Sequence, residues 1–189
     1  MAGHPVTPWA ERSDESLVRA AVIGEQAAFV AIVNRYGPQL LRYTRTLLPN
    51  SADAEEVVQD ALTAAWKGLD DFRFDSSLRT WLFTLAAHKA IDLRRKRKVV
   101  TIGGEVPDVQ PADASTDPEA RASNSQLFAA LNAALAELPY KQRACWWLRE
   151  IDGMRHTEIG TIMAMSPDAV RGQIDRAQKT LRAKMVKWT

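Results

Sequence analysis

The sequence predicts an all-α protein made of two small helical domains joined by a flexible acidic linker. Three observations support this fold class. Apolar residues recur at helical spacing through most of the chain, and neither strand-like alternation nor an internal repeat is found. Between the two periodic halves, residues 99–122 contain a Gly-Gly pair, three prolines and no aromatic residue, which is typical of a linker. We expect a disordered N-terminus over residues 1–12, an N-terminal domain over 13–98 and a C-terminal domain over 123–189.

Helix start and stop signals divide the N-terminal domain into four helices. Ser13 is expected to cap the first helix, with two acidic residues in its first turn, and Gly24 to end it. A long apolar stripe follows and continues past Pro38. Ser51 is expected to cap the third helix, whose exposed face carries Asp53, Glu56, Asp60 and Lys67.

The fourth helix begins as an apolar segment and ends in a run of cations. Trp81 could stack on an unpaired base, but the apolar residues around it favour a place in the core. The helix ends in five consecutive cations, Arg94 to Lys98. A solvated helix end that favours the helix dipole is the simple explanation. Five adjacent cations exceed that need, and phosphate binding is their natural use.

The C-terminal domain contains a helix-turn-helix pattern. A short helix over residues 157–164 is followed by a tight turn and by Ser166-Pro167-Asp168, a strong helix start. The last helix has a buried stripe and presents Arg171, Arg176 and Arg182 outward. Arginine pairs guanine bidentately and also binds phosphate, so these residues favour DNA binding. The alternative is an ordinary helical bundle with a solvated basic face.

Composition and charge limit the possible functions. The 189 residues include 46% hydrophobic and 25% charged residues, no apolar run of membrane-spanning length and no signal peptide. The single cysteine, Cys145, cannot form an internal disulfide, so we expect a cytoplasmic protein without membrane insertion. The net charge is +2 over residues 1–98, −5 over 99–120 and +5 over 121–189, which indicates different partners for the linker and the domains.

No catalytic or metal-binding constellation is found in the sequence. The three histidines and Cys145 lack zinc-type spacing, and there is no Gly-rich phosphate loop. We therefore expect no enzyme, no catalytic residue, no metal, no cofactor and no small-molecule substrate. On the third helix, Asp53 and Glu56 are explained by capping, whereas Gln59 and Asp60 lie beyond the first turn. These two are either solvated surface or a protein-docking site.

Four blocks, in order, resemble the bacterial RNA polymerase sigma factors of the extracytoplasmic-function type, in group 4 of the sigma-70 family. They are "AFVAIVNRYGPQLLRYTRTLL", "DAEEVVQDALTAAW", "FRFDSSLRTWLFTLAAHKAIDLRRKRK" and the segment from "ALAELP" to "RAQKTLR". The resemblance covers almost the whole chain. It implies a transcription initiation factor that binds core RNA polymerase, recognises the minus-ten and minus-thirty-five promoter elements and assists melting.

The resemblance also implies partners and residues. Core polymerase would be contacted through its beta-prime clamp and beta flap, with Asp53, Glu56, Val57, Gln59 and Asp60 at the clamp. Minus-ten DNA would be bound by Phe74, Asp75, Ser76, Ser77, Arg79, His88, Lys89, Arg94, Arg95 and Arg97. The minus-thirty-five element would be read by Ser166, Pro167, Asp168, Arg171, Gly172, Asp175, Arg176 and Lys179. An anti-sigma factor is implied as a further partner. The acidic linker would either occupy a basic polymerase channel or only keep the chain soluble.

The sequence departs from the family pattern at four positions of the helix-turn-helix. Gly160 stands where alanine is usual, and Ala164 where glycine is frequent. Ala169 replaces a common threonine, and Gly172 replaces a common serine. The other reading of the whole chain is a stand-alone helix-turn-helix regulator. Such a protein would have no use for an acidic docking face or a melting block.

Overall fold

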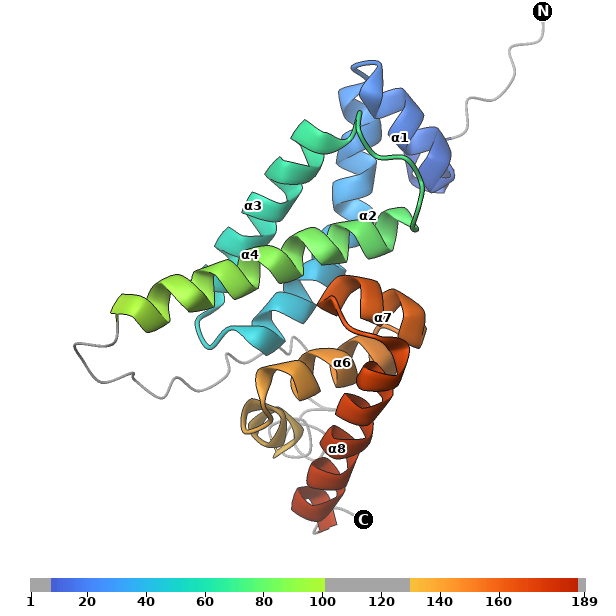
Figure 1. Cartoon of the computed structure of the whole chain (residues 1–189). Helices are drawn as coiled ribbons and strands as arrows, with labels where there is room; N and C mark the ends of the chain where they lie inside the picture. Colours follow the sequence, from blue (N-terminus) through green and yellow to red (C-terminus); the bar gives the residue numbers. More distant parts are fainter. Residues whose placement is uncertain (1–7, 101–129, 187–189) are drawn as a thin grey trace, which may run out of the picture.

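The helices of the protein form two groups, as the sequence predicts. The computed structural model describes residues 8–100 and 130–186, and no strand occurs within these ranges (Figure 1). The N-terminal lobe, residues 8–100, contains η1 (Trp9–Glu11), α1 (Asp14–Val22), α2 (Gln26–Leu47), α3 (Ser51–Gly68) and α4 (Leu78–Val100). The C-terminal lobe, residues 130–186, contains a helical segment over 130–136 and then α6 (Tyr140–Glu150), α7 (His156–Met163) and α8 (Pro167–Met185).

Capping side chains fix where most helices begin. Ser13 Oγ accepts a hydrogen bond from the Ser16 amide at 3.3 Å, and Ser166 Oγ accepts one from the Ala169 amide at 3.2 Å, which confirms both predicted caps. The predicted Ser51 cap is wrong. Asn50 Oδ1 accepts from the Ala52 amide at 2.8 Å, so the helix begins one residue earlier than its serine suggested.

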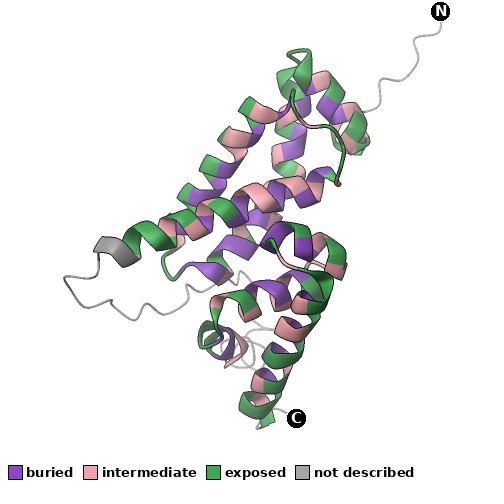
Figure 2. Cartoon of the chain, in the orientation of Figure 1, coloured by how far each residue is buried: buried purple, intermediate pink, exposed green. Residues whose placement is uncertain are grey.

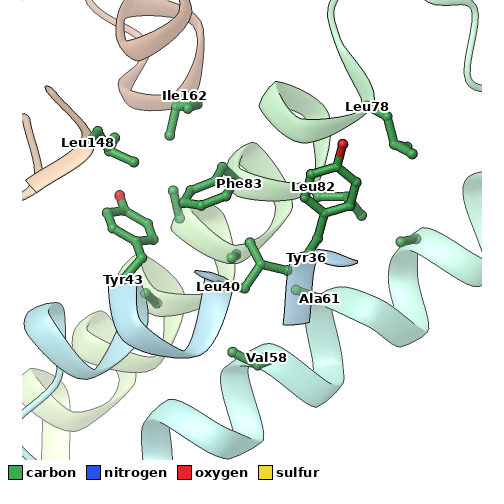
Figure 3. Packing of buried hydrophobic residues seen from close by; sticks show 14 of the residues in the cluster. Tyr36, Leu40, Tyr43, Val58, Ala61, Leu78, Leu82, Phe83, Leu148 and Ile162 are labelled. Atoms are coloured by element: carbon green, nitrogen blue, oxygen red, sulfur yellow. The ribbon is translucent and has the colours of Figure 1, made fainter. Parts of the chain in front are cut away.

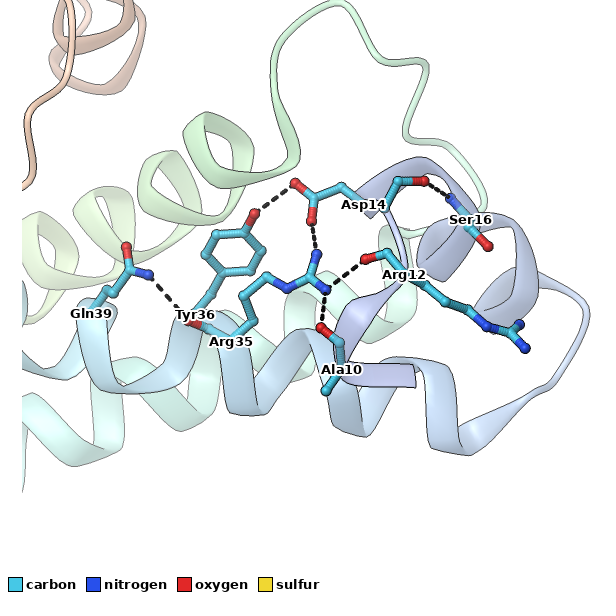
Figure 4. A network of polar contacts seen from close by, with 8 residues as sticks. Ala10, Arg12, Asp14, Ser16, Arg35, Tyr36 and Gln39 are labelled. Carbon is cyan, nitrogen blue, oxygen red and sulfur yellow. Dashed lines mark hydrogen bonds and ion pairs between the residues drawn. The ribbon is translucent and has the colours of Figure 1, made fainter. Parts of the chain in front are cut away.

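The N-terminal segment is more ordered than predicted. Residues 1–7 lie outside the described residues, but residues 8–12 form a 3₁₀ turn, so the expectation of disorder is wrong there. Arg35 of α2 holds this turn, because its guanidinium donates to the carbonyl oxygens of Ala10 at 2.9 Å and Arg12 at 2.7 Å (Figure 4). The same guanidinium binds Asp14 at 2.5 Å and thereby ties α1 to α2. The predicted linker falls mostly on residues 101–129, outside the described ranges.

The helices bury their apolar stripes against one another. Buried positions follow the inner faces of the helices in both lobes (Figure 2). The α8 stripe is as predicted, with Val170, Ile174, Ala177 and Leu181 buried. The predicted exposed face of α3 is wrong at one residue, because Asp53 is only 5% exposed. Arg97 of α4 reaches over it and forms an ion pair, which accounts for a buried carboxylate at this position.

The two lobes also pack against each other, which the sequence did not predict. Helix α7 contacts α4, and α6 contacts α2 (Figure 1). A single hydrophobic cluster therefore runs through both lobes, from Leu17 of α1 to Ile174 of α8. This packing places α7, the first helix of the helix-turn-helix, against α4.

Candidate nucleic-acid interface

Helix α8 presents one polar face to solvent. From Asp168 the predicted minus-thirty-five residues recur at helical spacing, so they share a face opposite the buried stripe. All eight are exposed apart from the half-buried Gly172: Ser166, Pro167, Asp168, Arg171, Gly172, Asp175, Arg176 and Lys179. Arg171 Nη1 and Asp168 Oδ1 lie 3.2 Å apart, in an exposed pair. Exposed pairs of this kind contribute little stability.

The turn before α8 has an unusual backbone. Ala164 ends α7 with φ of 51°, in the left-handed region that favours glycine. Four residues earlier, a Cβ on Gly160 would lie 2.6 Å from the carbonyl oxygen of Met165. Glycine at 160 therefore permits the close approach of the turn at Met165 to α7. These are two of the positions at which the sequence departs from the family pattern.

The loop between α3 and α4 carries a strained aromatic residue. Phe74 has φ of 60° and is 42% exposed, although a bulky residue rarely adopts this conformation. Its ring lies 4.7 Å from that of Phe72, which in turn lies 4.9 Å from Trp81. Trp81 is half-buried against the core, as the sequence favoured. Such strain is typical of binding sites.

The start of α4 is held in place by Ser77, whose Oγ accepts from the Thr80 amide at 3.0 Å. Asp75 and Ser77 are exposed, and Ser76 is half-buried, so the loop forms an open polar edge beside Phe74. An exposed aromatic ring beside hydroxyl and carboxylate groups can receive an unstacked base.

Helix α4 brings its cations to the surface, but several of them also bind other parts of the protein. His88 and the four residues Arg94 to Arg97 are exposed, and Lys89 is half-buried. Arg94 Nη1 donates to the carbonyl oxygen of Leu47 at 3.2 Å. Its guanidinium also lies 4.5 Å from the ring centre of Tyr140 in α6. The predicted site therefore contains cations with structural contacts.

Helix α3 exposes two different surfaces on either side of Gln59. On one side a groove of about 650 Å³ separates α3 from α2. Its apolar lining includes Phe29, Val33, Leu41, Val58, Leu62 and Trp66. On the other side, Glu56 and Asp60 face Lys89, Asp92 and Lys96 of α4. Of the predicted clamp residues, Glu56, Gln59 and Asp60 are exposed, whereas Asp53 and Val57 are buried beneath them.

Sequence reasoning missed the groove and the contact between the lobes. Trp66, at one end of the groove, packs its ring on Phe29 with 4.8 Å between ring centres and leaves 43% of the residue exposed. Arg79 lies at the start of α4. Its Nη2 lies 3.3 Å from Asp152 Oδ1 in the C-terminal lobe. No local pattern in the sequence indicates this long-range pair.

Two further features bear on the site. Across residues 8–100 and 130–186, no group of three or more histidine, cysteine or acidic side chains could hold a metal ion. Within the same ranges, no helix combines the length and apolar character needed to cross a bilayer.

Comparison with known proteins agrees with this geometry. The Sigma-70 region 2 family matches residues 32–99, and the Sigma-70, region 4 family matches residues 128–181. The RNA polymerase sigma factor NccH of Alcaligenes xylosoxydans xylosoxydans is 34% identical, over 90% of this chain and 93% of NccH. The ECF RNA polymerase sigma-E factor of Escherichia coli strain K12 is 31% identical, over 92% of this chain and 94% of its own length.

A solved structure of CnrH in complex with the cytosolic domain of CnrY has a TM-score of 0.69. It is 29% identical and covers 93% of this chain and 99% of the CnrH chain. The region 2 match begins within α2 and includes α3 and α4, which carry the acidic docking face and the melting block, and a stand-alone regulator would have no use for these two features. The chain therefore belongs to the extracytoplasmic-function sigma factors of the sigma-70 family, which initiate transcription by directing RNA polymerase to promoters.

Proposed function

We propose that the three surfaces divide the work of promoter recognition: α3 docks core polymerase, the α3–α4 loop and α4 bind the minus-ten element, and α8 reads the minus-thirty-five element. The observation that carries this proposal is the one-sided polar stripe of α8, opposite a stripe that is fully buried. A helix-turn-helix inserts such a face into the major groove of duplex DNA.

The docking surface for the beta-prime clamp consists of Glu56, Gln59 and Asp60, together with the apolar groove beside Gln59. A partner helix would place apolar side chains in the groove and cations near the carboxylates. Asp53 and Val57 contribute indirectly, because they are buried under this surface. The beta flap would contact the C-terminal lobe, and we assign it no residue.

Replacement of Gln59 and Asp60 by alanine tests the docking surface. In a pull-down, the double variant should capture at least about tenfold less core polymerase, since interface substitutions of this kind cost on the order of 1–2 kcal/mol. Glu25 and Gln26, an exposed acid-amide pair at the start of α2, provide a matched control. Equal capture by both double variants would remove this surface from the proposal.

In the minus-ten region, Phe74 and its polar neighbours would receive an extruded base, and the cations of α4 would hold the backbone. Replacing Arg94, Arg95 and Arg97 together by alanine should reduce open-complex formation. If each contacts one phosphate, the salt slope of promoter binding should fall by about 3. Wild-type permanganate reactivity of the promoter with this variant would contradict the assignment.

Run-off transcription with purified core polymerase on a pool of genomic fragments tests the function as a whole. Selective start sites should arise only when the protein is added. We further propose that the protein acts in the cytoplasm, without catalytic activity of its own, and that an anti-sigma factor controls it. The last point is supported by its relative CnrH, which was solved with the cytosolic domain of CnrY.

A further inference from the structure

The helix-turn-helix holds α8 on a buried support. Ile162 of α7 and Leu148 of α6 face Tyr43 of α2 and Phe83 of α4, and all four are at most 1% exposed (Figure 3). The buried stripe of α8, which begins at Val170, joins the same hydrophobic cluster. A functional side chain on a helix fixed in this way is positioned more precisely than one on a loop.

Two arginines on the polar face of α8 are held differently. Arg171 Nη1 lies 3.2 Å from Asp168 Oδ1, one turn towards the start of the helix. In the described parts of the chain, the Arg176 guanidinium forms no ion pair and donates no hydrogen bond, and only the carbonyl oxygen of this residue accepts a bond from the side chain of Thr180. The N–H donors of the Arg176 guanidinium are therefore available to a ligand.

The Arg176 guanidinium lies over Gly172, four residues earlier in the helix. A Cβ at residue 172 would lie 3.5 Å from Nη1, 3.7 Å from Nη2 and 3.9 Å from Cζ of Arg176. These are the three atoms nearest to it, apart from the adjacent residues and the nearby backbone of α8 itself. The missing side chain of Gly172 therefore leaves a place on the helix surface that this guanidinium takes up.

The backbone gives no other reason for glycine at this position. Residue 172 lies inside α8, and among the described glycines only Gly24 and Gly153 have a positive φ. Glycine within a helix is less favourable than alanine, because it loses more conformational freedom on folding. What glycine does provide at residue 172 is the space beneath Arg176.

The place taken up by the guanidinium favours a contact with a base. Helical side chains lean towards the N-terminus of the helix, and four residues correspond to about 6 Å along its axis. The charge of Arg176 is thereby brought towards the start of α8. In a helix-turn-helix, the N-terminal residues of the second helix reach base edges in the major groove. A bulky side chain at residue 172 would displace the guanidinium from this position.

We propose that Gly172 is a positioning residue for promoter recognition, which leaves room for the Arg176 guanidinium to lie along α8 and to pair with a base edge. This inference rests on the proposed function of α8 and deepens it, because it gives Gly172 a role that needs no DNA contact of its own. A methyl group at residue 172 fits, since 3.5 Å is an ordinary van der Waals separation. Serine, the usual residue of the family, would add a hydroxyl that can accept one of the guanidinium hydrogen bonds.

Holoenzyme made from the full-length protein and core RNA polymerase tests this inference. Genomic fragments that the holoenzyme retains on a filter are sequenced, which gives the base preference at each position of the upstream element. Gly172→Leu fills the space beneath the guanidinium, Gly172→Ala adds only a methyl group, and Arg176→Ala removes the guanidinium. The matched control is Ala183→Leu, because Ala183 is exposed on the same face near the end of α8. Circular dichroism verifies the helix content of each variant.

Arg176→Ala should abolish the preference for one base at one or two positions of the upstream element. Gly172→Leu should lower the preference at those same positions by about tenfold, which is within the range for loss of a bidentate base contact. Gly172→Ala and Ala183→Leu should keep it within about twofold of wild type. In the Arg176→Ala background, Gly172→Leu should have no further effect, because the guanidinium that it displaces is already absent.

Four results would overturn the inference. Wild-type preference in Gly172→Leu, together with a loss in Arg176→Ala, would reject the role of Gly172 and leave the function of α8 intact. So would equal losses in Gly172→Leu and Gly172→Ala. A further loss from Gly172→Leu in the Arg176→Ala background would show that the leucine clashes with DNA itself. Wild-type preference in Arg176→Ala, or no selection by the wild-type holoenzyme, would reject the proposed function of α8 and this inference with it.

Discussion

The two cation-bearing helices, α4 and α8, differ in how they combine stability with function. In α8, Arg171, Arg176 and Lys179 lie on an exposed stripe, and the opposite stripe holds the helix in its lobe. In α4, Arg79 and Arg97 form ion pairs with Asp152 and Asp53 of other elements. Cations on α4 therefore hold the protein together as well as facing solvent. Substitution of these ion-paired cations of α4 should change both folding and DNA binding, whereas substitutions on α8 should change binding alone.

The largest expected effect is a difference in the free energy of unfolding between variants of two nearby cations of α4, Arg97 and Arg95. Arg97→Ala leaves the buried carboxylate of Asp53 without its ion-pair partner, whereas Arg95 is exposed. Because about half of Arg97 is solvent-exposed, we expect its loss to lower the free energy of unfolding by about 2–3 kcal/mol, below the full cost of breaking a buried pair. Arg95→Ala should change it by less than about 0.5 kcal/mol. Urea denaturation measures the free energy of unfolding of both variants.

A second variant distinguishes charge from packing at this position. Asp53→Asn removes the buried charge and retains the size of the side chain. Combined with Arg97→Ala, it should recover part of the lost stability, since no uncompensated carboxylate then remains. Equal stability of the Arg97→Ala and Arg95→Ala proteins would mean that α4 cations are as dispensable for folding as those of α8.

The next effect concerns α8, where substitutions should weaken DNA binding and leave the stability of the fold unchanged. Arg171→Ala and Arg176→Ala should each weaken promoter binding by the holoenzyme by about 1–3 kcal/mol, if the side chains contact bases. Their melting temperatures should stay near wild type, because both residues are exposed. Filter binding on the cognate promoter and on random DNA measures the loss of affinity. Equal losses on the two DNAs would indicate phosphate contacts instead.

The sequence predicted the elements of the fold better than the contacts between them. The caps at Ser13 and Ser166 and the buried stripe of α8 follow from local rules, and the structure agrees with them. The Ser51 cap failed because Asn50 is an equally good acceptor one residue earlier. Capping preferences alone do not decide which of two adjacent residues, both good caps, begins the helix.

Tertiary contacts account for the other errors. The helical pattern places Asp53 on the polar face of the third helix, in the first turn, where the helix dipole favours an acidic residue. Arg97, far along the chain, buries it. Arg35 orders residues 8–12 in the same way, although proline and a lack of periodicity indicated disorder. The lobe interface depends on the same kind of information, since apolar residues such as Tyr43 do not reveal which surface they cover.

The smallest expected effect lies in the turn that orients α8. Ala164 adopts a left-handed conformation that glycine reaches without strain, so Ala164→Gly should raise the free energy of unfolding by about 0.5–1 kcal/mol. Gly160→Ala should lower it, because the new Cβ would meet the Met165 carbonyl oxygen at 2.6 Å. The double variant carries the family's usual pair of residues. If the turn relaxes once glycine occupies 164, the two changes should couple favourably in a double-mutant cycle of thermal stabilities. Strict additivity would mean that the two positions act independently and that the close approach at Gly160 does not depend on the conformation of residue 164.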